Sequence, residues 1–246
     1  LIYFNCILIC NIDIIFNYCT DHFMAKNLFY HLRCKQLCSF SQSRFFKLSN
    51  FNNAIFNHQA NFDGAQFNAS ASFNSTHFDS NADFSHAVFK APVNFDHAIF
   101  NHGIDLSYAN IHQASFKDSV ISGILDLSHL ELNKSILDLS DLEPLNANKA
   151  IEINLIGDDT NQIRLNYNDF HLYFPPGSSR KNIKTTYESL LKTFKNESDV
   201  TSYNKLYTEY KQYQYHLRGA YIKNFLDKHI WNYSLNKKKV FYWFIL

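Results

Sequence analysis

The chain has 246 residues, with 23 Lys and Arg against 22 Asp and Glu, and only six glycines and four prolines. This length can bury a substantial core in one or two domains. Scarce glycine, and the lack of a phosphate-binding loop or dinucleotide fingerprint, argue against a nucleotide-binding enzyme. The near-neutral charge hides a division, because residues 39–156 carry 12 acidic and 6 basic side chains whereas residues 177–246 carry 5 and 13.

Residues 1–38 form an N-terminal segment with several interpretations. Residues 1–19 are apolar but contain three Asn and Asp13. An acid near the middle of a spanning helix is costly, and both a basic n-region and a signal cleavage site are missing. A poor membrane segment, a degenerate signal peptide and translated upstream sequence all remain open. We favour the last, with the start at Met24, the single methionine.

The cysteines all lie in this N-terminal segment. Their odd number argues against a disulfide framework, and Cys34-x3-Cys38 lacks the second pair that a zinc site needs. We therefore expect unpaired thiols in a reducing compartment. The five residues are Cys6, Cys10, Cys19, Cys34 and Cys38.

A repeat with a period of eleven residues begins next. Large apolar side chains recur in two interleaved series, so the steps alternate between five and six residues. A small residue, mostly Ala, stands two positions before most of them, and the flanking positions are mostly Asn, Asp or Ser. One series is Phe40, Phe51, Phe62, Phe73, Phe84, Phe95 and Leu106; the other is Phe45, Phe56, Phe67, Phe78, Phe89, Phe100 and Ile111.

The repeat predicts a β-solenoid and not a helical supercoil. On an α-helix the two series would lie on separate faces, and the intervening Asn, Asp, Ser and His are poor helix formers. In an extended chain the small residue and the Phe two positions later point to the same side. Polar residues then turn the corner, four sides make a coil of two repeats, and successive coils stack about 4.8 Å apart. The two series are therefore expected to form the structural core ladder.

The repeat resembles the pentapeptide-repeat family, whose motif is A-(D/N)-(L/F)-x-x. The segments ANFDGAQF (60–67) and ADFSHAVF (82–89) carry this motif with one extra residue on alternate sides, a Phe-rich style within the family. The resemblance covers Phe40 to about Leu132 and implies a right-handed, four-sided β-helix. Beyond Ile111 the spacing loosens, and DLS recurs at 105, 126 and 138. We expect the β-helix over residues 39–174, with irregular final coils.

The filled interior predicts no catalytic residue, metal ligand or cofactor. A core of stacked rings leaves no cleft for a substrate. His58, His86, His97 and His102 each lie two positions after an inward residue, so we expect them to be exposed. His58 and His102, two coils apart, would be about 10 Å from each other, too far to share a metal ion. An enzyme or metal protein that uses these histidines is the weakest alternative.

Residues 180–236 are predicted to be helical. One apolar face would be formed by Tyr187, Leu190, Leu191 and Phe194, with NESD (196–199) as a capped turn before the next helix. The second helix would use Val200, Tyr203, Tyr207, Tyr210, Tyr213 and Leu217. A third stripe comprises Tyr221, Ile222, Phe225, Leu226, His229, Ile230 and Tyr233.

This region resembles the helical extension of a membrane-linked subset of the same family. There a Tyr-rich helix is followed by a Trp-bearing segment and a membrane helix, and Trp231 and KKK (237–239) fit that order. Residues 237–246 would then start an apolar tail that enters the membrane, although VFYWFIL is shorter than the roughly 20 residues of a span. The lysines would place the preceding domain in the cytoplasm. Packing of this tail on the helices is the alternative.

These features together predict a non-enzymatic, bacterial-type scaffold or interaction module with an unknown protein partner. We expect it on the cytoplasmic face of the inner membrane, or in the cytoplasm if the tail is not a membrane segment. The alternative is an acidic rod that mimics DNA and binds a topoisomerase such as gyrase, as some pentapeptide-repeat proteins do. Direct binding of nucleic acid is not expected.

Overall fold

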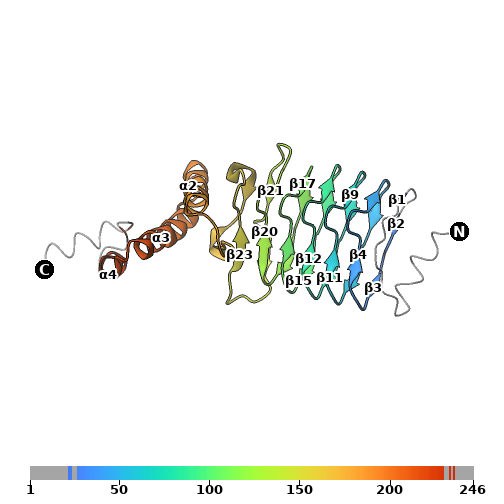
Figure 1. The fold of residues 1–246 in the computed structure, drawn as a ribbon, viewed down its shortest axis with the longest axis horizontal. Helices are drawn as coiled ribbons and strands as arrows, with labels where there is room; N and C mark the ends of the chain where they lie inside the picture. Colours follow the sequence, from blue (N-terminus) through green and yellow to red (C-terminus); the bar gives the residue numbers. More distant parts are fainter. Residues whose placement is uncertain (1–21, 24–26, 230–232, 234, 236–246) are drawn as a thin grey trace. The chain divides into compact units, whose positions relative to one another are not determined.

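A computed structural model describes residues 22–23, 27–229, 233 and 235, and the chain divides into two compact units, Leu1–Thr186 and Tyr187–Leu246. The first unit is a parallel β-solenoid and the second is helical (Figure 1). The predicted fold class, a β-solenoid followed by helices, is thus confirmed. Met24, Cys6, Cys10 and Cys19 lie outside the described residues, as do most of residues 1–26 on which the interpretations of the N-terminus depend.

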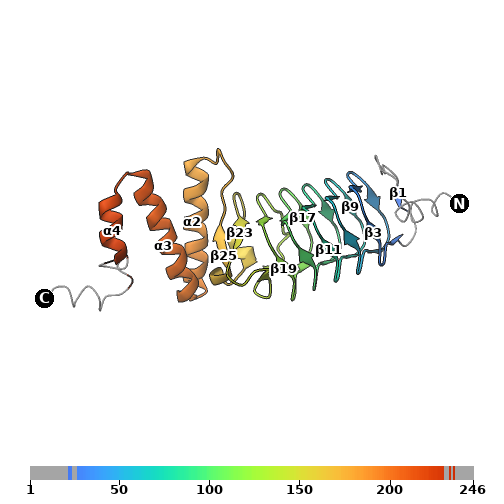
Figure 2. The same cartoon turned by 90° about the horizontal axis from the view of Figure 1, so that it is seen from below.

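Four parallel sheets form the sides of the solenoid, and each regular coil adds one short strand to every sheet (Figure 2). The first sheet contains β1 (His22–Phe23), β5 (Arg44–Phe45), β9 (Gln66–Phe67), β13 (Val88–Phe89) and β17 (Asn110–Ile111). The second contains β2 (Asn27–Leu28), β6 (Ser49–Asn50), β10 (Ala71–Ser72), β14 (Val93–Asn94) and β18 (Ala114–Ser115).

The other two sides continue further along the chain. The third sheet contains β3 (Arg33–Cys34), β7 (Ile55–Phe56), β11 (His77–Phe78), β15 (Ile99–Phe100), β19 (Val120–Ile121) and β22 (Glu143–Pro144). The fourth contains β4 (Cys38–Ser39), β8 (Ala60–Asn61), β12 (Ala82–Asp83), β16 (Ile104–Asp105), β20 (Ile124–Asp126), β23 (Ile151–Asn154) and β25 (Phe170–Leu172). Strands β1 to β3 show that the solenoid starts before residue 39.

Stacked rings fill the interior. All fourteen residues of the two apolar series are buried, and all but Phe40 are completely inaccessible. Each ring lies nearly parallel to the ring one coil away; the centroids of Phe62 and Phe84 are 4.7 Å apart at an interplanar angle of 1°. Rings of the same interior also meet edge to face, as Phe62 and Phe73 do at 5.4 Å and 84°. Both are favourable aromatic geometries, each worth about 1 kcal/mol beyond burial.

Two kinds of corner produce the alternation of five and six residues. At the five-residue corner an Asn or Asp side chain accepts a hydrogen bond from the N–H two residues on, as Asn61 does from Asp63 at 2.9 Å. The following residue, Gly64, has a φ of 63°, and the N–H of Ala65 closes the turn on the carbonyl of Phe62 at 3.0 Å. A positive φ at the third turn position is typical of type II turns. The six-residue corners of the described regular coils lack this turn.

The register changes where the apolar spacing loosens. Phe45 pairs with Phe67, one full coil later, whereas Val93 pairs with Ala114 after a coil that is shorter by one residue, because one corner between them has lost its extra residue. Later coils are irregular: Asp126 pairs with Asn154, and the inserted chain carries β21 (Leu137–Asp138), which pairs with β24 (Ile163–Arg164). The 3-10 helices η1 (Thr160–Gln162) and η2 (Tyr167–Asp169) complete this region.

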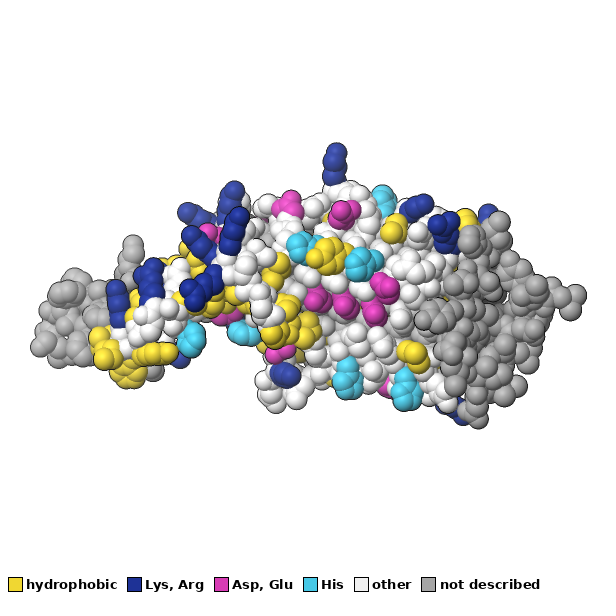
Figure 3. Space-filling model, viewed as in Figure 1, with side chains coloured by type: hydrophobic (Ala, Val, Ile, Leu, Met, Phe, Trp, Pro, Cys, Tyr) yellow, Lys and Arg dark blue, Asp and Glu magenta, His cyan; other side chains and the backbone are white. Residues whose placement is uncertain are grey.

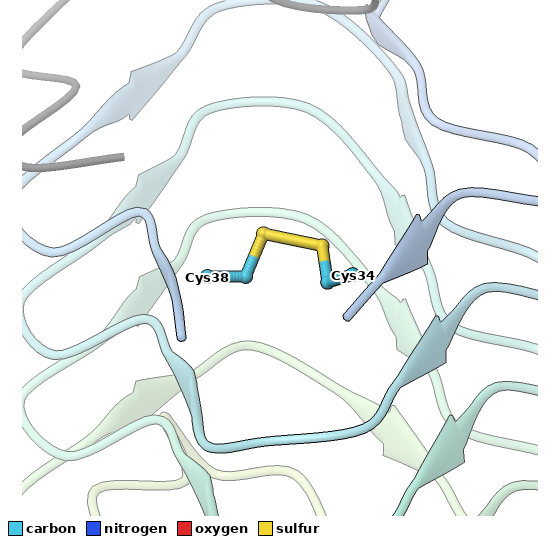
Figure 4. The surroundings of a disulfide bond; sticks show 2 residues. All are labelled: Cys34 and Cys38. Atoms are coloured by element: carbon cyan, nitrogen blue, oxygen red, sulfur yellow. A yellow bond between two sulfur atoms is a disulfide. The ribbon is translucent and has the colours of Figure 1, made fainter. Parts of the chain in front are cut away.

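Cys34 and Cys38 are joined by a disulfide across the corner between β3 and β4 (Figure 4). Both side chains are buried, and their Cα atoms are 6.2 Å apart. Cys34 occupies a ring position, paired with Phe56, and Cys38 occupies a small-residue position, paired with Ala60. Both therefore point inward from adjacent sides, and the expectation of unpaired thiols is wrong for this pair. Spacing along the chain did not reveal the bond because the coil geometry, not a cysteine motif, brings the two sulfurs together.

The helical unit contains most of α2 (Arg180–Asn196) with α3 (Val200–Leu217) and α4 (Tyr221–His229). The predicted face of the first helix is buried throughout, and Asp199 caps α3 by accepting a hydrogen bond from the N–H of Ser202 at 3.0 Å. The predicted face of α3 is wrong in part. The buried residues of α3 are Ser202, Leu206 and Tyr210, which lie four residues apart on one side of the helix. Val200 lies away from that side and is 67% exposed.

A charge placed in the ring stack should unfold the neighbouring coils. We expect Phe84→Asp to lower the free energy of unfolding by about 4 kcal/mol, because it buries an unpaired carboxylate and leaves a cavity beside Phe62. Phe73→Asp should behave in the same way. Thermal unfolding followed by circular dichroism measures the effect, with His58→Asp at an exposed corner as the control. A melting temperature equal to that of the wild type would show that the ring does not face inward.

The irregular coils should lose stability as the pH rises from about 4 to 8, because of Asp158. Its Oδ1 accepts a hydrogen bond from the N–H of Leu130 at 2.9 Å, while its Oδ2 is buried without a partner among the described residues. Burial, with a smaller contribution from Asp126, raises the pKa of Asp158 to about 8 from the usual 3.8. The folded state therefore favours the protonated acid, and stability falls as the pH rises from about 4 to 8.

We expect Asp158→Asn, which keeps an acceptor for Leu130 and does not titrate, to stabilise the protein at pH 8 by roughly 1 to 3 kcal/mol. The gain should vanish near pH 4. Thermal melts across this range measure it, and Asp141→Asn at an exposed position is the control. An equal difference in melting temperature at both pH values would contradict a buried, protonated Asp158.

Candidate functional site: columns of exposed rings and carboxylates

A four-residue pattern repeats at the same corner of three successive coils. The segments are DFSH (83–86), DLSY (105–108) and DLSH (126–129). In each, the second residue is a buried core residue and the fourth has a positive φ between 55° and 57°. The acid and the ring at the two ends of each segment therefore face outward on the same side of the solenoid. Because the coils are in register, each chemical group forms a column.

The rings of His86, Tyr108 and His129 form one column. His86 and Tyr108 stack with centroids 5.2 Å apart at 4°, and Tyr108 and His129 stack at 4.7 Å and 18°. Tyr108 is 54% exposed. The corresponding corner one coil before is Gly64, while on the other side a side chain at Gly157 would come within 2.3 Å of the ring of His129. The column thus has a glycine at each end.

The carboxylates of Asp83, Asp105 and Asp126 form the parallel column. They are partners in the register of β12, β16 and β20, and each accepts a hydrogen bond from the N–H of the serine two residues on. Burial, with smaller contributions from the Asp126 and Asp83 carboxylates, raises the pKa of Asp105. Within the described residues no Lys or Arg forms an ion pair with these acids. The column is therefore a concentration of uncompensated negative charge.

Figure 3 shows this side of the solenoid. A row in which histidine and hydrophobic side chains alternate runs beside a row of acidic side chains, and few basic side chains interrupt it. Lys and Arg gather instead over the helices α2 to α4. The charge division of the sequence thus corresponds to a division between the two units.

The four histidines singled out in the sequence are all exposed, as expected. They are separate from one another, with His86 near Asp63 at 3.2 Å and His97 near Asp118 at 3.9 Å. His102 lies 2.8 Å from the carbonyl of Asp79. In the part of the chain that the structure describes, no group of three His, Cys, Asp or Glu side chains could hold a metal ion.

The sequence interpretation does not identify the ring column. It treats His86 as a single exposed residue and does not consider Tyr108 or His129. The available signal was an aromatic residue directly after D-x-S, at an interval of one coil and then of one coil less a residue. This pattern predicts a column of rings only if the shorter coil keeps the three corners in register, as the pairing of Asp105 with Asp126 shows.

The helical unit presents a second unusual surface on α4. The polar side of this helix faces its neighbours, since the hydroxyl of Tyr215 donates to the carboxylate of Asp227 and that of Tyr233 donates to Oδ1 of Asn224 at 2.7 Å. The apolar side faces outward, with Tyr221 63% and Ile222 80% exposed. None of the helices among the described residues has the length and apolar character to cross a membrane.

Reciprocal hydrogen bonds join α2 and α3 within the same unit. The hydroxyl of Tyr187 donates to Glu209 at 2.9 Å, and that of Tyr210 donates to Glu188 at 3.0 Å. The two rings stack with centroids 4.9 Å apart. Burial, followed by the carboxylate of Glu209, raises the pKa of Tyr187, so these phenols remain protonated donors. They join α2 to α3.

Comparison with known proteins supports the repeat directly. A family model described as pentapeptide repeats (9 copies) matches residues 73–120, which lie within the regular coils. No curated protein and no solved structure is significantly similar to the chain. The match, the ladder of inward rings and the four parallel sheets agree with one another. Residues 73–120 are therefore pentapeptide repeats, and they fold as part of the β-solenoid.

Proposed function

We propose that the protein is a non-enzymatic interaction module that binds another protein on the outer face of its solenoid. The observation that carries this proposal is the division between inside and outside. The inward positions are filled by stacked rings, so the interior offers no space for a substrate. The outward positions repeat one coil apart and present the same kind of group several times. Such repetition suits an extended contact with a partner.

A pull-down with the full chain tests this proposal. One variant, Asp83→Lys/Asp105→Lys, reverses the charge on the side that carries the acidic column. A matched variant, Asn57→Lys/Asn101→Lys, adds positive charge at another corner. We expect one protein to be captured by the wild type and the matched variant, and at least tenfold less by the charge reversal. Equal capture by both variants, or capture by the unfolded Phe84→Asp chain, would contradict a specific face.

Mimicry of DNA is a narrower form of the same function, and the acidic column is the observation that favours it. The repeat region carries 12 acidic and 6 basic side chains between residues 39 and 156. In this alternative the partner is a topoisomerase such as gyrase. Supercoiling by gyrase in the presence of the full chain decides between the two forms, because absence of inhibition at micromolar protein would exclude the mimic and leave the interaction module intact.

We also propose that the C-terminal end associates with the cytoplasmic face of the bacterial inner membrane. The support comes from α4, whose apolar side faces outward beside Lys223 and Lys228. A helix of this kind lies at a bilayer surface with its apolar side among the acyl chains and its lysines near anionic headgroups. Without the membrane, the protein would remain in the cytoplasm and act through the solenoid alone.

Vesicle sedimentation tests the membrane contact. We expect the full chain to bind vesicles of phosphatidylcholine mixed with anionic phosphatidylglycerol, and Tyr221→Glu/Ile222→Glu to bind at least fivefold more weakly, since two carboxylates would have to enter the apolar layer. Val200→Glu, at an exposed position of α3, is the control. Equal binding of both variants, or no binding by the wild type, would contradict membrane association through α4.

A further inference from the structure

The ring column occupies corners where rings are costly. The left-handed conformation suits glycine, and it strains a bulky residue such as Tyr108 by about 1 kcal/mol or more. Gly64 occupies the same corner one coil earlier, so the turn itself does not need a ring. Stacking with His86 and His129 returns a comparable free energy, about 0.5 to 1.5 kcal/mol for each pair. The strain and the stacking thus roughly cancel, and the turn, which Gly64 forms without a ring, does not require the three exposed rings.

The column of acids gives the same face a charge. Asp83, Asp105 and Asp126 are spaced by one coil each and have no cationic partner among the described residues. Each acid lies in the same turn as one ring. One level of the face thus offers a carboxylate, a serine, and either a phenol oxygen or an imidazole nitrogen. This combination repeats on successive coils with the spacing of hydrogen-bonded strands.

We propose that this face binds an arginine-rich, extended segment of a partner protein, with guanidinium groups distributed over the three levels. The inference rests on the proposed interaction function and names the chemistry of its partner. A guanidinium is planar and presents five N–H donors in a fixed fork, so it can bind a carboxylate and a neighbouring ring acceptor at one level. His86 and His129 cover the two faces of the Tyr108 ring, so a guanidinium would meet Tyr108 at its hydroxyl and not at a ring face.

Arginine fits this face better than lysine. An ammonium group is a compact, strongly hydrated point charge, and it would bind the carboxylates without using the rings. A preference for arginine over lysine at equal charge therefore reports the contribution of the ring column. The acids alone would bind arginine and lysine with equal affinity, and added salt would weaken the two interactions equally.

Fluorescence anisotropy with short labelled peptides tests the proposal on the full chain. The probes are Arg-Ser-Arg-Ser-Arg and Lys-Ser-Lys-Ser-Lys at the same ionic strength. We expect the arginine peptide to bind at least fivefold more tightly. His86→Asn/Tyr108→Asn/His129→Asn should remove that preference and weaken binding of the arginine peptide at least fivefold. Asn tolerates the left-handed conformation, so this variant should retain the fold, which its melting temperature checks.

The matched control is His97→Asn/Asp118→Asn, which changes the other column of left-handed corners. It should bind the arginine peptide as the wild type does. Equal dissociation constants for the two peptides, or an unchanged dissociation constant in the triple variant, would overturn the proposal. If either of these results came with a face-specific partner in the pull-down, the proposed interaction function would stand. Only the proposal that the partner is arginine-rich would be wrong.

Discussion

Stacking of inward rings from coil to coil is the interaction on which the rest of the solenoid depends. Parallel strands of two or three residues have too few hydrogen bonds to be stable alone, and neighbouring coils must share a buried interior. Rings such as Phe62 and Phe84 meet this need because parallel rings with centroids 4.7 Å apart match the spacing of hydrogen-bonded strands. The alternation of two corner types follows, since each side must deliver one small residue and one ring to the interior.

The corners then determine what the protein presents to its surroundings. The Asn or Asp that closes the five-residue turn uses one side-chain oxygen for the turn itself, as Asp83 and Asp126 do. The left-handed residue two positions after the inward ring points outward, where the interior imposes no restriction on its size. Within a single repeat, the inward residues thus stabilise the fold, and the outward residues are the ones that a partner would contact. The inward positions are uniform, whereas the outward positions vary from Gly64 to Tyr108.

The last helix of the helical unit, α4, directs its polar side towards its neighbours and its apolar side outward. Helices α2 and α3 bury Leu190, Phe194 and Leu206, as amphipathic helices normally do. Helix α4 instead uses Asp227 and Asn224 for contacts within the unit and leaves Ile222 exposed. This exposed apolar surface is the one that we propose to contact a bilayer. The acidic face of the solenoid and the basic helical unit accordingly have different proposed ligands.

The period of eleven residues by itself determined the class of fold, the inward positions and the exposure of the four histidines, because burial in an extended chain follows directly from spacing. The alternation of steps also located the corners. Tertiary structure decided which outward residues meet. Cys34 and Cys38 are joined because adjacent sides converge on the interior, and His86, Tyr108 and His129 align because a coil shortened by one residue keeps their corners in register. The buried side of α3 was likewise settled by packing, since its Tyr-rich sequence presents apolar surface on more than one side of the helix.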